Sequence, residues 1–64
     1  MFGERLKKAR EAAGMSQAEV ARELGLSQPA YSYIENGEKN PSLPVAKRLS
    51  VVLCVSLDYL LGLK

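Results

Sequence analysis

The stretch from residue 28 to residue 36 carries side chains suited to hydrogen bonding with nucleic-acid bases. On a helical wheel of about 100° per residue, Tyr31 and Ile34 mark its inner side. The opposite side has no carboxylate, so a phosphate-lined groove would not repel it. Glutamine can pair with adenine through two hydrogen bonds, serine can bond several bases, and tyrosine can contact a thymine methyl group or a phosphate. An ordinary solvated helix face is the alternative, but such a face more often carries Lys and Glu. The outward residues are Gln28, Pro29, Ser32, Tyr33 and Asn36.

The residue types needed for common catalysis and metal binding are scarce. The chain has no histidine, and its single cysteine, Cys54, lies in an apolar stretch. A base–nucleophile pair, a His/Cys metal site and an internal disulfide are therefore all excluded. No glycine-rich phosphate loop or paired acidic site is visible. We expect no catalytic residue, no metal, no cofactor and no enzymatic activity.

Helix start and stop signals position the polar stretch. Ser16 and Glu19 form a capping box that begins one helix, and Gly25 ends it. Only residues 25–27 separate this helix from the next, which ends near residue 36. Two short helices joined by a three-residue turn containing glycine form a helix-turn-helix unit, here at about residues 16–36. Pro29 leaves the start of the second helix open: either Ser27 caps it, or Gln28 does and Pro29 is its first residue.

The remaining signals predict three more helices. One precedes the unit and ends near Gly14, one begins after Ser42, and one begins after Ser56. Nothing alternates with the period of a β-strand. The sequence therefore predicts an all-α, compact five-helix bundle forming a single domain, residues 1–64. The inner face of the fourth helix is expected to comprise Leu43, Ala46, Leu49, Val52 and Leu53.

Composition and charge agree with a small globular domain. Of 64 residues, 47% are hydrophobic and 25% charged, with a net charge of +2, a balance typical of folded chains. The longest apolar run, residues 51–55, is far shorter than a membrane span, and the N-terminus has no apolar signal region. We expect a cytoplasmic protein without a membrane partner. Basic residues gather at Arg5, Lys7, Lys8 and Arg10, and again at Lys39, Lys47 and Arg48.

Stretches along nearly the whole chain match one family in order and spacing. The sequence resembles the phage Cro and repressor family of helix-turn-helix proteins, the XRE family. The resemblance implies a lambda repressor-like domain that binds specific double-stranded DNA and regulates transcription, expected as a repressor, with its third helix in the major groove. The matching stretches are residues 6–10, 14–21, 25–28, 34–37, 40–43 and 55–61.

The resemblance also implies roles for single residues. Arg10 and Glu35 match a pair that joins the first helix to the third and orients it. Gln17 at the start of the second helix would contact a phosphate, although a plain first-turn residue is the alternative. Lys39 would also contact the DNA backbone, and a solvated charge in a loop is the alternative. Base-reading positions are Gln28, Pro29, Ser32 and Tyr33, and DNA backbone positions are Gln17, Ser27, Asn36, Lys39 and Asn40.

The last part of the chain carries apolar residues outside the inner pattern, namely Val51, Tyr59 and Leu63. They are either scattered surface hydrophobes or a dimer interface. The family generally binds two-fold operators as dimers through this end, so the resemblance implies a homodimer on a pseudo-palindromic operator. No small-molecule ligand is evident. A protein-interaction module, such as an antitoxin or a regulator adaptor, is the competing function.

Three residues depart from the family pattern. Tyr31 replaces the usual aliphatic residue, so its hydroxyl needs a partner or an exit to water. Pro44 lies in the first turn of the fourth helix, where proline is tolerated. Cys54 follows the same helix where the family often has glycine. If the backbone is left-handed there, a cysteine costs about 1 kcal/mol.

Overall fold

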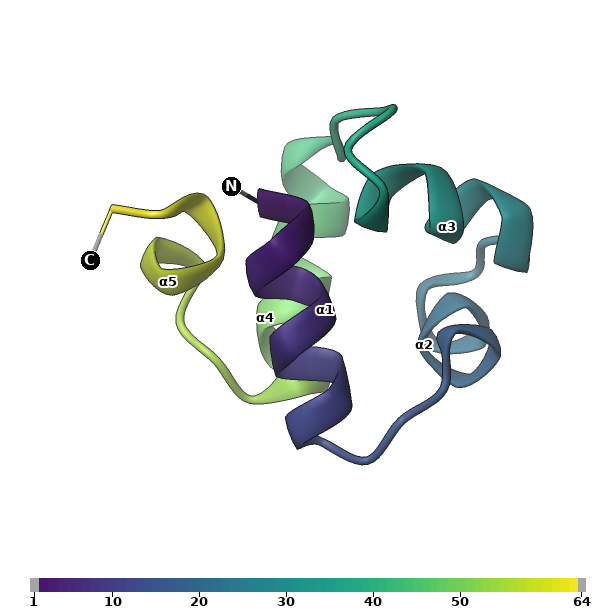
Figure 1. Ribbon diagram of the computed structural model, residues 1–64, viewed down its shortest axis with the longest axis horizontal. Helices are drawn as coiled ribbons and strands as arrows, with labels where there is room; N and C mark the ends of the chain where they lie inside the picture. Colours follow the sequence, from purple (N-terminus) through teal and green to yellow (C-terminus); the bar gives the residue numbers. More distant parts are fainter. Residues whose placement is uncertain (1, 64) are drawn as a thin grey trace.

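The five helices expected from the sequence are present in the computed structural model, which describes residues 2–63 (Figure 1). No strand occurs within that range, so the prediction of an all-α five-helix bundle is confirmed. The helices are α1 (Phe2–Ala12), α2 (Gln17–Leu24), α3 (Gln28–Glu35), α4 (Leu43–Leu53) and α5 (Leu57–Leu61).

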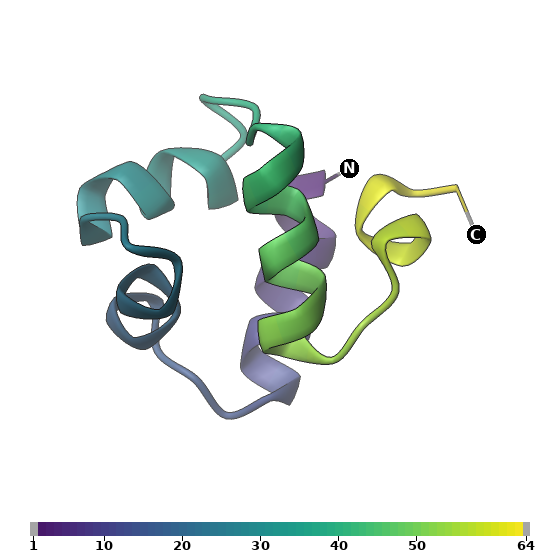
Figure 2. The same cartoon turned by 180° about the vertical axis from the view of Figure 1, so that it is seen from behind.

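Helices α3 and α5 lie at opposite ends of the molecule. Both views show α1 and α4 crossing the middle, with α2 and α3 on one side and α5 on the other (Figures 1 and 2). Helix α1 packs against α3 and α5, while α4 packs against α2 and α5. The Arg48 guanidinium of α4 also donates to the Glu23 carbonyl near the end of α2, at 2.9 Å. The longest dimension is 29 Å, and it separates the α3 end from the α5 end.

A serine caps the N-terminus of each helix from α2 to α5. At α2 the capping box is complete: the Glu19 N–H donates to the Ser16 hydroxyl at 3.1 Å, and the Ser16 N–H donates to the Glu19 carboxylate at 2.9 Å. At α3 the Ser27 hydroxyl accepts from the Ala30 N–H at 3.2 Å. Ser27 is therefore the cap and Gln28 the first helical residue, which resolves the alternative left open by Pro29.

The core combines residues from all five helices. Its largest fully buried side chains are Leu6, Val20, Tyr31, Leu49 and Leu60. The expectation that Leu43 faces inward is wrong, because its side chain is 60% exposed. Leu43 is the first residue of α4, and the first buried residue of that helix is Ala46.

Membrane-spanning and metal-binding elements are not found among residues 2–63. The longest helices there, α1 and α4, have 11 residues each, whereas a bilayer requires about 20. The same residues contain no group of three or more His, Cys, Asp or Glu side chains placed to share a metal ion.

Cys54 ends α4 in a left-handed conformation, as its position in the sequence suggested. Its backbone has φ 56° and ψ 40°, and its N–H donates to the Ser50 and Val51 carbonyls. Every other positive φ in residues 2–63 belongs to glycine. A side chain at such angles brings Cβ close to the following carbonyl oxygen, so this helix end carries local strain.

Replacing Cys54 with glycine should therefore raise the free energy of unfolding by about 1 kcal/mol. Urea unfolding in the presence of a reductant measures the effect. Cys54→Ala is the matched control: it removes the thiol but retains Cβ, so it should give no comparable gain. A glycine variant no more stable than the alanine variant would contradict the assignment of strain to Cβ.

Candidate nucleic-acid interface

A tight reversal between α2 and α3 places α3 at the surface. Helix α2 ends at Gly25, whose φ of 72° is readily adopted by glycine, and the Gly25 N–H donates to the Ala21 and Arg22 carbonyls. The Leu26 N–H also donates to the Ala21 carbonyl, at 2.9 Å. Ser27 then starts α3, which packs back against α2 and against α1. With its caps, the resulting helix-turn-helix spans residues 16–36.

One face of α3 is exposed and uncharged. Gln28, Pro29, Tyr33 and Asn36 are exposed, and Tyr33 remains 50% accessible. Ser32 is half-buried and its hydroxyl accepts from the Asn36 amide at 3.4 Å. The structure thus brings the five residues predicted from the helical wheel onto one surface. We call this surface, made by Gln28, Pro29, Ser32, Tyr33 and Asn36, the polar face of α3.

The only carboxylate of α3, Glu35, is turned away from the polar face and buried. Its side chain is 3% exposed and accepts from Arg10 twice, from Nε at 2.9 Å and from Nη2 at 3.0 Å. Arg10 Nη1 donates to the Met15 carbonyl at 2.9 Å. The two residues expected to pair are therefore joined by a fork-shaped bidentate contact, which fixes the angle between the charged groups as well as their distance.

Gln17 is part of the same network. Its amide Nε2 donates to Glu35 Oε1 at 3.1 Å, so α1 and α2 both supply donors to one carboxylate of α3. No sequence spacing connects residues 17 and 35, and sequence reasoning missed this contact. The contact of Gln17 with a DNA phosphate stays a prediction, and in this structure its amide links the start of α2 to the end of α3.

The buried carboxylate stays ionised because of its donors. Burial raises the pKa of Glu35, but the Arg10 guanidinium, the Tyr31 hydroxyl and the Gln17 amide outweigh burial and hold that pKa below its ordinary value. Tyr31 itself is 0% exposed, and within residues 2–63 its hydroxyl has no hydrogen-bond partner of standard geometry. Burial raises the pKa of Tyr31, and the neighbouring Glu35 carboxylate raises it further. The phenol therefore stays neutral beside the Glu35 carboxylate, although the two groups do not meet in standard hydrogen-bond geometry.

Gly3 brings α1 into close contact with the end of α3. The residue is buried, and a Cβ at this position would lie 2.3 Å from the Glu35 carbonyl oxygen. A Cβ atom does not fit at that distance. The close approach of the two helices therefore depends on glycine at position 3. Sequence reasoning passed over Gly3, although glycine inside a helix costs stability and therefore signals a packing requirement.

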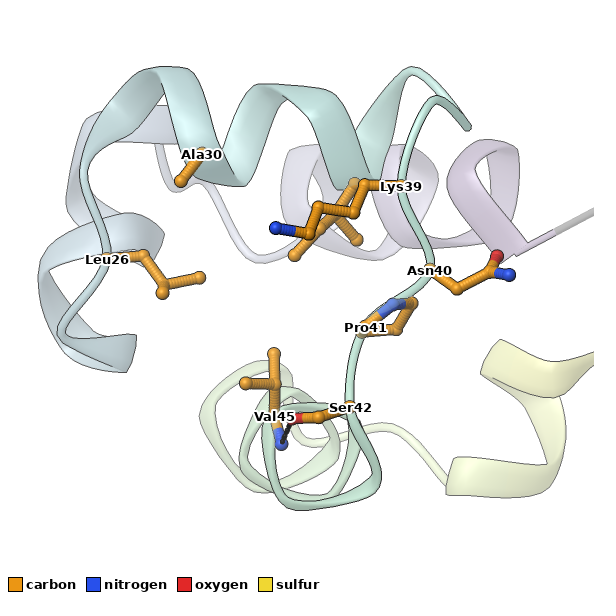
Figure 3. Close-up of a pocket in the computed structure, with 8 residues that line it drawn as sticks. Leu26, Ala30, Lys39, Asn40, Pro41, Ser42 and Val45 are labelled. Atoms are coloured by element: carbon orange, nitrogen blue, oxygen red, sulfur yellow. Dashed lines mark hydrogen bonds between the residues drawn. The ribbon is translucent and has the colours of Figure 1, made fainter.

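The loop after α3 contains two residues that are predicted to contact the DNA backbone. Lys39 and Asn40 are both exposed, and the Lys39 N–H donates to the Tyr33 carbonyl at 3.2 Å. The Lys39 side chain extends across a hollow of about 350 Å³ between α3 and α4, whereas Asn40 points away from it (Figure 3). The hollow is lined by Leu26, Ala30, Ile34, Lys39, Asn40, Pro41, Ser42 and Val45.

The three residues predicted for a dimer interface differ in exposure. Val51 is 77% exposed and Leu63 is 69% exposed. Tyr59 is half-buried, and its ring lies beneath the Arg5 guanidinium, 5.2 Å from Cζ to the ring centroid. Val51 and Tyr59 line two different hollows, one on α4 and the other between α1 and α5. Sequence reasoning missed two further exposed apolar residues, Leu43 and Leu61, which together line a third hollow.

The helix-turn-helix architecture also matches a family model. Residues 6–60 match the model described as Helix-turn-helix. The chain is 46% identical over 61 residues to the SPbeta prophage-derived uncharacterized HTH-type transcriptional regulator YonR of Bacillus subtilis (strain 168), covering 95% of this chain and 56% of that protein. It is 43% identical over 61 residues to the uncharacterized HTH-type transcriptional regulator YqaE of the same strain, covering 95% and 53%. The chain thus spans about half the length of these relatives.

A solved structure has the same fold. The crystal structure of SinR, described as the master regulator for biofilm formation, in complex with DNA superposes with a TM-score of 0.86 at 37% identity. The match covers 95% of this chain and 98% of that one. The relatives and the structural neighbour are regulators, which agrees with the expectation that the chain is not an enzyme.

Proposed function

This chain belongs to the helix-turn-helix family of the Cro and C1 repressor type, and from that premise we propose that it binds specific double-stranded DNA and represses transcription. The polar face of α3 is the observation that carries the proposal. It is exposed and free of carboxylates, because the only carboxylate of α3 is buried against Arg10. A helix with such a face fits the major groove, about 12 Å wide, and offers donors and acceptors to base edges.

Contacts with the DNA backbone would hold α3 in the major groove. We assign them to Gln17, Ser27, Asn36, Lys39 and Asn40. The Ser27 hydroxyl already caps α3 and the Gln17 amide already bonds Glu35, so each would share its group with a phosphate or use another atom. Lys39 and Asn40 are exposed in the loop that follows α3. Such contacts set the position and register of the protein but carry no sequence information.

Gln28 and Lys39 should therefore respond differently to replacement by alanine. Gln28→Ala should cost about 1–3 kcal/mol of binding to the preferred site and relax the preference at one base position. Lys39→Ala should weaken binding to all sequences alike and reduce the slope of log affinity against log salt by about 1. Fluorescence anisotropy with a preferred duplex, a single-base variant and an unrelated duplex measures both effects.

Both side chains are exposed, so neither substitution should unfold the domain, and circular dichroism verifies this. Equal, sequence-independent losses from the two variants would contradict the division between base reading and backbone contact. A wild-type salt slope near zero would contradict the proposal itself and favour a protein partner, since each neutralised phosphate contributes about −0.9 to the slope.

We further propose a homodimer joined at the α5 end. Of the predicted interface residues, Val51 and Leu63 expose apolar side chains and Tyr59 is half-buried. Leu43 and Leu61 are exposed as well and line one hollow together. Helix α3 lies at the other end of the 29 Å axis. Half-sites lie about 34–36 Å apart, one DNA turn, so the two copies would have to be inclined to each other in a way that brings their reading helices to that separation. A pseudo-palindromic operator would suit this symmetry, and a DNA-bound regulator would act in the cytoplasm.

A further inference from the structure

We infer that this chain recognises its half-site through A·T pairs, with Gln28 reading an adenine and Tyr33 a thymine methyl group. The inference rests on the proposed function and names the bases that its reading face selects. The first observation is an absence on α3: its sequence QPAYSYIE contains no arginine or lysine. Bidentate contact of such a side chain with guanine is the commonest specific contact in the major groove. The polar face of α3 therefore lacks the usual means of selecting a G·C pair.

Gln28 is free to contact a base. It is the first residue of α3, it is exposed, and its amide makes no hydrogen bond within residues 2–63. Ser27 caps the helix, so the Gln28 side chain is not needed for that purpose. An amide donates and accepts in one plane, which matches the N7 acceptor and N6 donor of adenine.

Tyr33 presents a large apolar surface on the same face. Tyr33 is 50% exposed, and one turn earlier the face carries Pro29, which has no N–H to donate. The Ser32 and Asn36 side chains on this face are partly engaged with each other, because the Asn36 amide donates to the Ser32 hydroxyl. The exposed ring is therefore better suited to an apolar group of the groove than to a hydrogen-bonding edge, and the thymine methyl is that group.

The spacing of the two residues sets the expected spacing of the bases. Five residues of α-helix rise about 7.5 Å, which corresponds to about two base-pair steps of 3.4 Å. The adenine and the thymine methyl should therefore lie within two or three base pairs of each other in one half-site. Because Gln28 is at the N-terminus of α3, its adenine marks one edge of the half-site.

Base analogues in a bound duplex test the inference. The duplex is first selected from random sequences with the wild-type chain. Each thymine of a half-site is then replaced, one at a time, by uracil, which lacks only the methyl group. One replacement should weaken wild-type binding about fourfold, the effect of losing one buried methyl group. Tyr33→Ala should bind the thymine and uracil duplexes equally, whereas Tyr33→Phe, which keeps the ring, should still distinguish them.

The adenine contact is tested in the same duplex. Replacing one adenine by 7-deazaadenine removes the N7 acceptor and should weaken wild-type binding, while Gln28→Ala should no longer distinguish the two bases. Uracil tolerated at every position, or a selected half-site defined by G·C pairs, would overturn the inference while leaving DNA binding intact. A chain that selects no duplex would instead overturn the proposed function. Every variant alters an exposed position, and circular dichroism verifies that each variant is folded.

Discussion

Replacing Arg10 with alanine should destabilise the domain by about 3–5 kcal/mol, the cost of leaving a buried carboxylate without its charged partner. Glu35 is buried, and among residues 2–63 it would retain the Gln17 amide as its remaining side-chain donor of standard geometry, with the neutral Tyr31 phenol nearby. Small domains have stabilities near the lower end of the 5–15 kcal/mol range. Most of the stability would thus be lost, and urea unfolding measures the difference directly.

Two further variants separate stability from orientation. Lys8→Ala removes an exposed positive charge from the same helix and should change stability by less than about 0.5 kcal/mol. Arg10→Met combined with Glu35→Leu removes both buried charges and should recover much of the stability lost in Arg10→Ala. If the pair orients α3, the recovered double variant should still bind DNA more weakly than the wild type. An Arg10→Ala variant as stable as Lys8→Ala would contradict the assigned role of the ion pair.

The second large effect is expected at Gly3. Helix propensity alone favours Gly3→Ala by about 1 kcal/mol, but the new Cβ would lie 2.3 Å from the Glu35 carbonyl oxygen. That oxygen is backbone, so α1 and α3 must move apart, and overpacking of this kind costs about 1–3 kcal/mol. We expect a net loss of stability and, because the end of α3 shifts, weaker DNA binding by the folded fraction.

Thermal unfolding and DNA titration at a temperature where the variant is fully folded measure the two consequences. Glu4→Ala is the matched control, since it places alanine at the neighbouring, exposed position of the same helix. A Gly3→Ala variant that is more stable than the wild type would show that propensity dominates and that the close approach of α1 to α3 is dispensable.

These two sites show how far the sequence can be interpreted. Helix boundaries and caps are local, because a serine and a backbone N–H two or three residues later decide them. They were therefore predictable, as were the buried and exposed sides of α3. The contact of Gly3 with the Glu35 carbonyl joins segments 32 positions apart, and it depends on how the helices pack. No local pattern encodes such a contact.

The Arg10–Glu35 pair is an intermediate case. The residues are 25 positions apart, and their pairing was predicted only through the resemblance to a family. The additional bond from Gln17 to Glu35 was not predictable from the sequence, because it joins residues 18 positions apart and depends on how α2 packs against α3. The predicted dimer residues Val51, Tyr59 and Leu63 all lie outside the inner pattern of the sequence, but that pattern does not show that the Tyr59 ring packs under the Arg5 guanidinium.

Selection of bound sites from a pool of random duplexes tests the central claim most directly. The account predicts one enriched motif with two related halves about one helical turn apart, and affinity that falls steeply as salt increases. A variant with alanine at both Gln28 and Tyr33 should lose the motif while keeping weak, salt-sensitive binding. A wild-type chain that enriches no motif, and whose affinity for DNA does not change with salt, would contradict the account.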